Sequence, residues 1–134
     1  MNVSNPSPFA DIEYHHPCNW DTALPALVLP QMFADSTGRA PDAPLVHFMG
    51  RTFSYADLYA DARKFAAALM RHGIAPGDRV GLFLPNVPIY VAAYYGAMMA
   101  GAVVVNFSPL YTVEELSHQV KDSGTRMLVT LDVP

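Results

Sequence analysis

A long stretch without charge constrains the fold of this chain more than any other feature of its sequence. No Asp, Glu, Lys or Arg occurs between Arg79 and Glu114, and much of this stretch is strongly apolar. Such a segment is typical either of a membrane span or of the interior of a folded domain. Several prolines and glycines interrupt it, and the β-branched cluster 103–105 follows Gly101 directly. These breaks predict a buried helix and then a buried strand instead of a span.

Short apolar runs alternate with helical patterns through the second half of the chain. A helix is predicted from Pro88 to Ala100, and TVEE at 112–115 is a capping box for a helix that should stop at Gly124. This alternation predicts an α/β fold, a three-layer-like unit in which crossover helices cover a small parallel sheet. The predicted strands are Val80 to Leu84, Ala102 to Asn106 and Arg126 to Leu131.

The first part of the chain has a different character. Repeated prolines block long regular elements, so residues 1–44 are predicted to be an N-terminal arm with one short helix from about Pro30 to Thr37, stopped by Gly38. Residues 45–134 are predicted to form a partial α/β subdomain. It opens with LVHFMGRTFSY, in which glycine at the first of two turn residues, Gly50 and Arg51, predicts a β-hairpin.

A further helix is predicted directly after the hairpin. Ser54 offers an N-cap hydroxyl, Asp57 stands three residues on, and Gly73 ends the pattern. Between them apolar residues recur at helical spacing, so one face of this helix should be buried. The apolar positions are Leu58, Ala62, Phe65 and Leu69, joined by Tyr55, Tyr59, Ala66 and Met70.

Composition argues against several classes of function. The formal net charge is -4 and the few basic residues are scattered, which does not favour a nucleic-acid partner. Cys18 is the only cysteine, so no disulfide can form within the chain, and no secretory signal opens it. No glycine pattern of a phosphate loop occurs, and Lys64 and Lys121 fall on predicted solvated helix faces. We therefore expect a cytoplasmic protein without a transmembrane segment.

Side chains capable of catalysis or metal binding are isolated from one another in the sequence. The adjacent His15 and His16 would diverge in an extended arm, and Cys18 has no evident activating base. His47 falls in a predicted strand and His118 on a predicted helix, where a lone histidine is more often structural than a ligand or base. We therefore assign no catalytic, cofactor-binding or metal-binding residue to this chain.

Two features leave a binding role open. Asn106 ends a predicted parallel strand, where open α/β sheets place ligand crevices, although it can equally cap the following loop. An aromatic and methionine stripe suits the wall of an apolar pocket, although core packing is the favoured interpretation. The stripe consists of Tyr90, Tyr94, Tyr95, Met98 and Met99.

Several blocks of sequence occur in an informative order. They are GRTFSYADL, GIAPGDRVGLFLPNVPIYVAAYYGAMMAGAVVV, NFSPLYTVEEL and DSGTRMLVTLD, between Leu45 and Asp132. In these blocks the chain resembles the early region of adenylate-forming acyl-CoA synthetases. The most similar members activate long- or medium-chain fatty acids, while 4-coumarate ligases, luciferases and peptide-synthetase adenylation domains share the blocks.

The resemblance implies a two-step reaction that uses ATP, Mg²⁺ and coenzyme A. A carboxylate attacks the α-phosphate of ATP to form an acyl-adenylate, whose acyl group then passes to the thiol of coenzyme A. In this family the phosphate loop, the nucleotide contacts, the magnesium ligand and the catalytic lysine all lie later in the chain. None of them maps onto a residue of this sequence, so we expect the chain to be inactive alone.

Two classes of function remain open. The chain is either an N-terminal fragment of an acyl-CoA synthetase, with an aryl-CoA ligase as a variant, or a stand-alone module that binds a small molecule or a partner. An end directly after a predicted strand favours the fragment. Its partner would be the remainder of the parent chain. An unprotected edge strand at 127–131 also predicts self-association of the fragment as a symmetric dimer.

Overall fold

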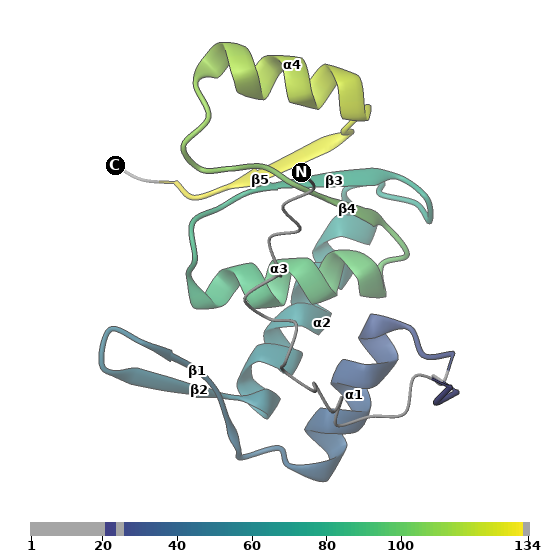
Figure 1. Ribbon diagram of the computed structural model, residues 1–134, viewed down its shortest axis with the longest axis vertical. Helices are drawn as coiled ribbons and strands as arrows, with labels where there is room; N and C mark the ends of the chain where they lie inside the picture. The colour runs from purple at the N-terminus through teal and green to yellow at the C-terminus, as the bar shows by residue number, and fades with distance from the viewer. Residues whose placement is uncertain (1–20, 24–25, 133–134) are drawn as a thin grey trace, which may run out of the picture.

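The computed structural model describes residues 21–23 and 26–132 and shows a mixed α/β fold (Figure 1). The elements found in these residues are α1 (Leu29–Arg39), β1 (Pro44–Phe48), β2 (Arg51–Ser54), α2 (Tyr55–Arg71), β3 (Arg79–Phe83), α3 (Pro88–Met99), β4 (Val103–Asn106), α4 (Val113–Ser123) and β5 (Met127–Thr130).

The parallel sheet forms the middle of three layers. Its strand order is β4-β3-β5, and β3 pairs in parallel with both neighbours. The chain moves from β3 outward to β4 and then returns across β3 to β5. Right-handed crossovers in opposite directions place their helices on opposite faces, and Figure 1 shows α3 with α2 on one face and α4 on the other. The predicted α/β fold and three-layer arrangement are confirmed, and the strand order is new information.

The predicted elements are all present, with two local corrections. Helix α1 continues through Gly38 to Arg39, because glycine lowers helix stability without forbidding the conformation. The hairpin turn consists of Met49 and Gly50 instead of Gly50 and Arg51, since Phe48 pairs with Arg51. Both turn residues have positive φ, 47° and 76°, as a type I′ turn requires.

The main core lies between β3 and the helices α2 and α3. Val80 and Leu82 point from β3 toward these helices and have 0% of their surface exposed. Full burial of such side chains contributes about 1.5–3 kcal/mol each. The two helices approach closely because Gly96 has no side chain: a Cβ there would lie 2.5 Å from the backbone oxygen of Ala62. A stripe of small residues along α3 and its C-cap is buried and consists of Ala92, Ala93, Gly96, Ala97 and Ala100.

A second core cluster joins α1 and the hairpin to the helices. Phe33 of α1 is buried, and its ring centroid lies 5.5 Å from that of Tyr59 and 4.3 Å from that of Tyr95. Leu45, Val46 and Phe53 of the hairpin pack against the same cluster. The hairpin is therefore anchored to α2 at its base. Met70, predicted on the buried face of α2, is instead half exposed in the last turn.

The face of the sheet that carries α4 is less completely covered. Helix α4 has no buried residue, and only Leu116, Val120 and Ser123 are half-buried. Beneath it, Gly81 of β3 is buried under the ring of Phe107, which a Cβ at Gly81 would meet at 2.4 Å. No helix among the described residues is long and apolar enough to cross a membrane.

Candidate functional site

The carboxyl edge of the parallel sheet is the position where this topology places a crevice. The segment after β3 leads to α3 on one face, whereas the segment after β4 leads to α4 on the other (Figure 1). Adjacent strands whose following segments diverge in this way define a topological switch point, and open α/β sheets bind ligands there. This switch point lies between the carboxyl ends of β3 and β4, and Asn106 is the last residue of β4.

A hydrogen bond links α3 to the end of β4 at this switch point. The Tyr90 hydroxyl of α3 donates to Oδ1 of Asn106 at 2.8 Å. Burial, followed by the nearby Tyr94, raises the pKa of Tyr90, so its hydroxyl keeps its proton at neutral pH and remains a donor. This bond ties α3 to the last residue of β4. Tyr90 of the aromatic and methionine stripe and Asn106 at the end of the predicted strand, both identified in the sequence, therefore contact each other.

A small polar-rimmed cavity lies beside Tyr90. Its volume is about 240 Å³, and it separates the first strand of the hairpin from the beginning of α3. His47 stands in its wall and pairs through Nδ1 with Thr52 Oγ1 at 2.9 Å, across the hairpin. The lining residues are Val46, His47, Phe48, Asn86, Val87, Tyr90 and Val91.

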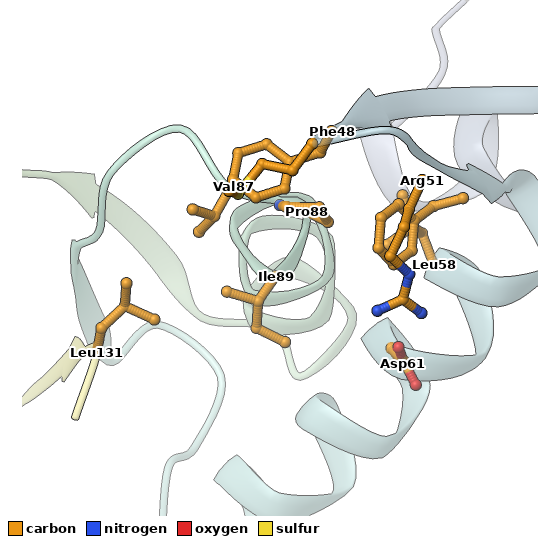
Figure 2. Close-up of a pocket in the computed structure, with 10 residues that line it drawn as sticks. Phe48, Arg51, Leu58, Asp61, Val87, Pro88, Ile89 and Leu131 are labelled. Atoms are coloured by element: carbon orange, nitrogen blue, oxygen red, sulfur yellow. The ribbon is translucent and has the colours of Figure 1, made fainter. Parts of the chain in front are cut away.

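A larger and more apolar cavity lies on the other side of Val87. It has a volume of about 420 Å³ and draws its walls from the hairpin, α2, the beginning of α3 and the segment after β5 (Figure 2). Arg51 and Asp61 supply its only charged groups. The lining residues are Phe48, Met49, Arg51, Phe53, Leu58, Asp61, Val87, Pro88, Ile89 and Leu131.

An ion pair holds the amino edge of the sheet together. Arg126, just before β5, forms an ion pair with Asp78, just before β3. Asp78 also accepts a hydrogen bond from the Ala75 backbone N–H at 2.7 Å. The backbone bond at Ala75 lowers the pKa of Asp78 most, and Arg126 lowers it further. Charge thus fixes the end of the sheet opposite to the cavities.

The isolated histidines and lysines identified in the sequence do not come together in the described part of the chain. His118 lies exposed on α4, and Lys64 pairs with Asp61 at 2.9 Å within α2. Lys121 lies in the last turn of α4, where a cation complements the helix dipole. His15, His16 and Cys18 lie outside the described residues. Within residues 21–23 and 26–132, no three His, Cys, Asp or Glu side chains are grouped as a metal site would require.

Comparison with known sequences assigns the class. The sequence pattern of the AMP-binding enzyme family matches residues 33–134. A "Long-chain-fatty-acid--CoA ligase" of Bacillus subtilis is 39% identical over 121 residues, which cover 90% of this chain and 22% of that protein. A relative with the same description from Escherichia coli is 42% identical over 102 residues, covering 75% and 18%. The chain therefore spans about a fifth of the length of these curated relatives.

Solved structures agree with this result. An N-terminal subdomain of NpsA from Klebsiella oxytoca, in complex with 3-hydroxyanthranilyl-AMSN, superposes with a TM-score of 0.75 at 25% identity, covering 78% of this chain and 27% of that one. The N-terminal domain of FACL13 from Mycobacterium tuberculosis gives 0.72 at 29% identity, covering 75% and 26%. The chain belongs to the AMP-binding enzyme family. The resemblance to the N-terminal part of an acyl-CoA synthetase is confirmed.

Proposed function

We propose that this chain is the N-terminal part of an ATP-dependent fatty-acid–CoA ligase and does not form acyl-adenylate by itself. The observation that carries the proposal is the identity of 39–42% with long-chain-fatty-acid–CoA ligases over most of the chain. Such a ligase converts a fatty acid, ATP and coenzyme A into acyl-CoA, AMP and pyrophosphate. We place it in the cytoplasm, where these cosubstrates occur.

The residues of this chain do not fit ATP or Mg²⁺. Its sequence has no glycine loop with a lysine, and its described part has no cluster of metal-ligating side chains. We therefore propose that ATP, Mg²⁺ and coenzyme A are bound by the remainder of a longer parent chain, which is also the principal partner of this segment. No chemical step is assigned to residues of this chain.

Pyrophosphate exchange with a panel of fatty and aryl acids tests the proposal. The chain alone should give no exchange above a heat-treated control, and a longer parent chain should give exchange that depends on a fatty acid. Exchange by the chain alone would contradict the inactivity. Exchange only with aryl acids would favour the aryl-CoA ligase, a second candidate supported by 40% identity over 78 residues with a 4-coumarate–CoA ligase of Nicotiana tabacum.

We also propose that the isolated chain forms a symmetric dimer through β5. This strand is an edge of the sheet and contains no lysine or proline, and Leu128 within it and Leu131 directly after it are more than a third exposed. Light scattering at micromolar concentration should give the dimer mass. Leu128→Asp should restore the monomer, while a monomeric wild-type chain would refute the dimer.

A further inference from the structure

We propose that the larger cavity, of about 420 Å³, is a docking site for the remainder of the parent chain, which fills it with uncharged apolar side chains. This inference rests on the proposed function in one respect only, that the chain is part of a longer protein. It adds the surface at which the two parts meet and the chemistry of the segment that covers it.

The rim of the cavity exposes large apolar side chains to water. Met49 at the hairpin tip is 86% exposed, Ile89 at the beginning of α3 44% and Leu131 after β5 36%. Figure 2 shows Ile89 and Leu131 pointing toward one another across the cavity. Adjoining apolar side chains of this kind mark a contact surface, and covering them is favourable in proportion to the area buried. The flexible thioether of Met49 suits contact with an irregular partner surface.

The two charged groups of the cavity do not select a charged occupant. Arg51 and Asp61 have opposite signs, and Figure 2 shows the guanidinium pointing toward Asp61. The guanidinium also lies 5.2 Å from the Phe53 ring centroid, and Asp61 pairs with Lys64 at 2.9 Å. An ionic group that entered the cavity would lose its hydration while both charges already have partners. The cavity therefore fits uncharged apolar side chains.

The size of the related domains indicates which polypeptide covers this surface. The chain covers 27% of the NpsA N-terminal subdomain and 26% of the FACL13 N-terminal domain, so about three quarters of each lies outside the matched part. The elements of one domain pack around a shared hydrophobic core, so the remainder needs apolar surface of this chain to pack against.

The position of the cavity favours it over the other exposed surfaces. Leu131 belongs to the segment after β5, so in a longer parent the residues that follow it start beside the cavity, and a short tether gives them a high effective concentration there. The outer side of α2 instead carries the exposed cations Arg63 and Lys64. A second apolar pair, Leu110 and Val113, is 89% and 86% exposed at the start of α4 and is the alternative docking surface.

Thiol labelling of the chain and of a longer parent chain tests the docking site. Cys18→Ser removes the only native thiol, and Ile89→Cys then places one in the cavity wall. N-ethylmaleimide should label this thiol about tenfold more slowly in the longer chain, because a covered thiol is not accessible to the reagent. Arg63→Cys, on the outer side of α2, is the matched control and should be labelled equally fast in both chains.

The outcomes separate the possible occupants. Equal labelling of Ile89→Cys in the two chains, or slower labelling of Val113→Cys alone, would overturn the docking site, as would equal protection of the Arg63→Cys control. Protection of the isolated chain that rises with its concentration, or of the longer chain only with added fatty acid, would assign the cavity to a second copy or to a ligand and overturn the assigned occupant. Pyrophosphate exchange of the longer chain is measured separately, so protection without exchange would refute the ligase and support the docking site.

Ile89→Asp should affect the two chains differently. In the isolated chain the carboxylate lies exposed in the first turn of α3, where it complements the helix dipole, so the urea midpoint should change little. In the longer chain the carboxylate would be buried without a partner and should lower the midpoint clearly. Ile89→Met preserves an apolar contact and should leave both midpoints close to wild type. An equal response of both chains to Ile89→Asp would show that the remainder does not cover this position and refute the docking.

Discussion

The two faces of the parallel sheet share the same strands but differ in how they are covered. On one face Val80 and Leu82 are fully buried beneath α3 and α2. On the other, α4 contributes no buried side chain and covers the sheet with half-buried residues such as Leu116. The difference originates in the helices: the small-residue stripe of α3 allows close packing, whereas α4 is largely polar. Stability should therefore be concentrated on the α3 face.

The largest expected effect is the loss of a core side chain from the α3 face. Leu82→Ala should lower the free energy of unfolding by about 3 kcal/mol, because it removes a fully buried side chain and leaves a cavity. Leu116→Ala on α4 should lower it by less than about 1 kcal/mol, since little apolar surface is covered there. Urea unfolding of both variants measures the contrast. Equal losses would show that the faces contribute equally.

The next effect concerns the close contact between α3 and α2. Gly96→Ala should lower the free energy of unfolding by about 2 kcal/mol, because the new methyl group would meet the Ala62 carbonyl oxygen and Phe65. Gly38→Ala is the matched control in α1, where nothing lies within 4 Å of the added atom. That substitution should raise stability by about 0.5–1 kcal/mol through helix propensity. Destabilisation by both would point to a general intolerance of glycine replacement.

The same capping device occurs on both sides of the sheet and should have different consequences. Ser54 and Asp57 form a capping box at α2, and Thr112 and Glu115 form one at α4. Ser54→Ala should lower global stability by about 1 kcal/mol, since α2 is part of the core. Thr112→Ala should mainly increase amide hydrogen exchange within α4, with a smaller change in urea unfolding. A global loss from Thr112→Ala as large as that from Ser54→Ala would contradict the view of α4 as a peripheral element.

The smallest expected effect is the pH dependence of these two capping boxes. Hydrogen bonds from the cap residues lower the pKa of Asp57 below its ordinary 3.8 and that of Glu115 below its ordinary 4.5. The resulting stabilisation is present above the ordinary values and is lost as pH falls through the lowered ones. Asp57→Asn should therefore reduce the acid-induced loss of stability. An identical pH profile of unfolding in Asp57→Asn and wild type would exclude this contribution.

Local signals in the sequence predicted most of the fold. Proline at Pro88, the Thr112–Glu115 capping pair and glycine at Gly124 define helix ends through short-range geometry, and the observed helices begin and end near them. The predicted hairpin turn, Gly50 and Arg51, is off by one residue. The sequence pattern favoured glycine as the first turn residue, whereas the pairing of Phe48 with Arg51 makes Met49 the first and Gly50 the second.

Contacts between distant residues could not be predicted in the same way. The pairing of Tyr90 with Asn106 depends on how α3 packs over the end of β4, which no periodicity reveals. The larger cavity forms only where the hairpin, α2, α3 and Leu131 meet, whereas the sequence pattern around Arg51 indicates no more than a turn. The absence of catalytic residues and the boundary between residues 44 and 45 stay predictions.

The central position of β3 has a consequence for synthesis on the ribosome. This strand is made before both of its neighbours, because β4 and β5 follow it in the chain and then pair on opposite sides of it. During translation both edges of β3 are therefore unpaired at first, and after β4 has paired, the edge that will bind β5 is still open. The helices α2 and α3 can already cover Val80 and Leu82 at this stage. The sheet of the nascent chain thus grows outward from the middle, and the second edge of β3 is paired only when residues 127–130 have emerged.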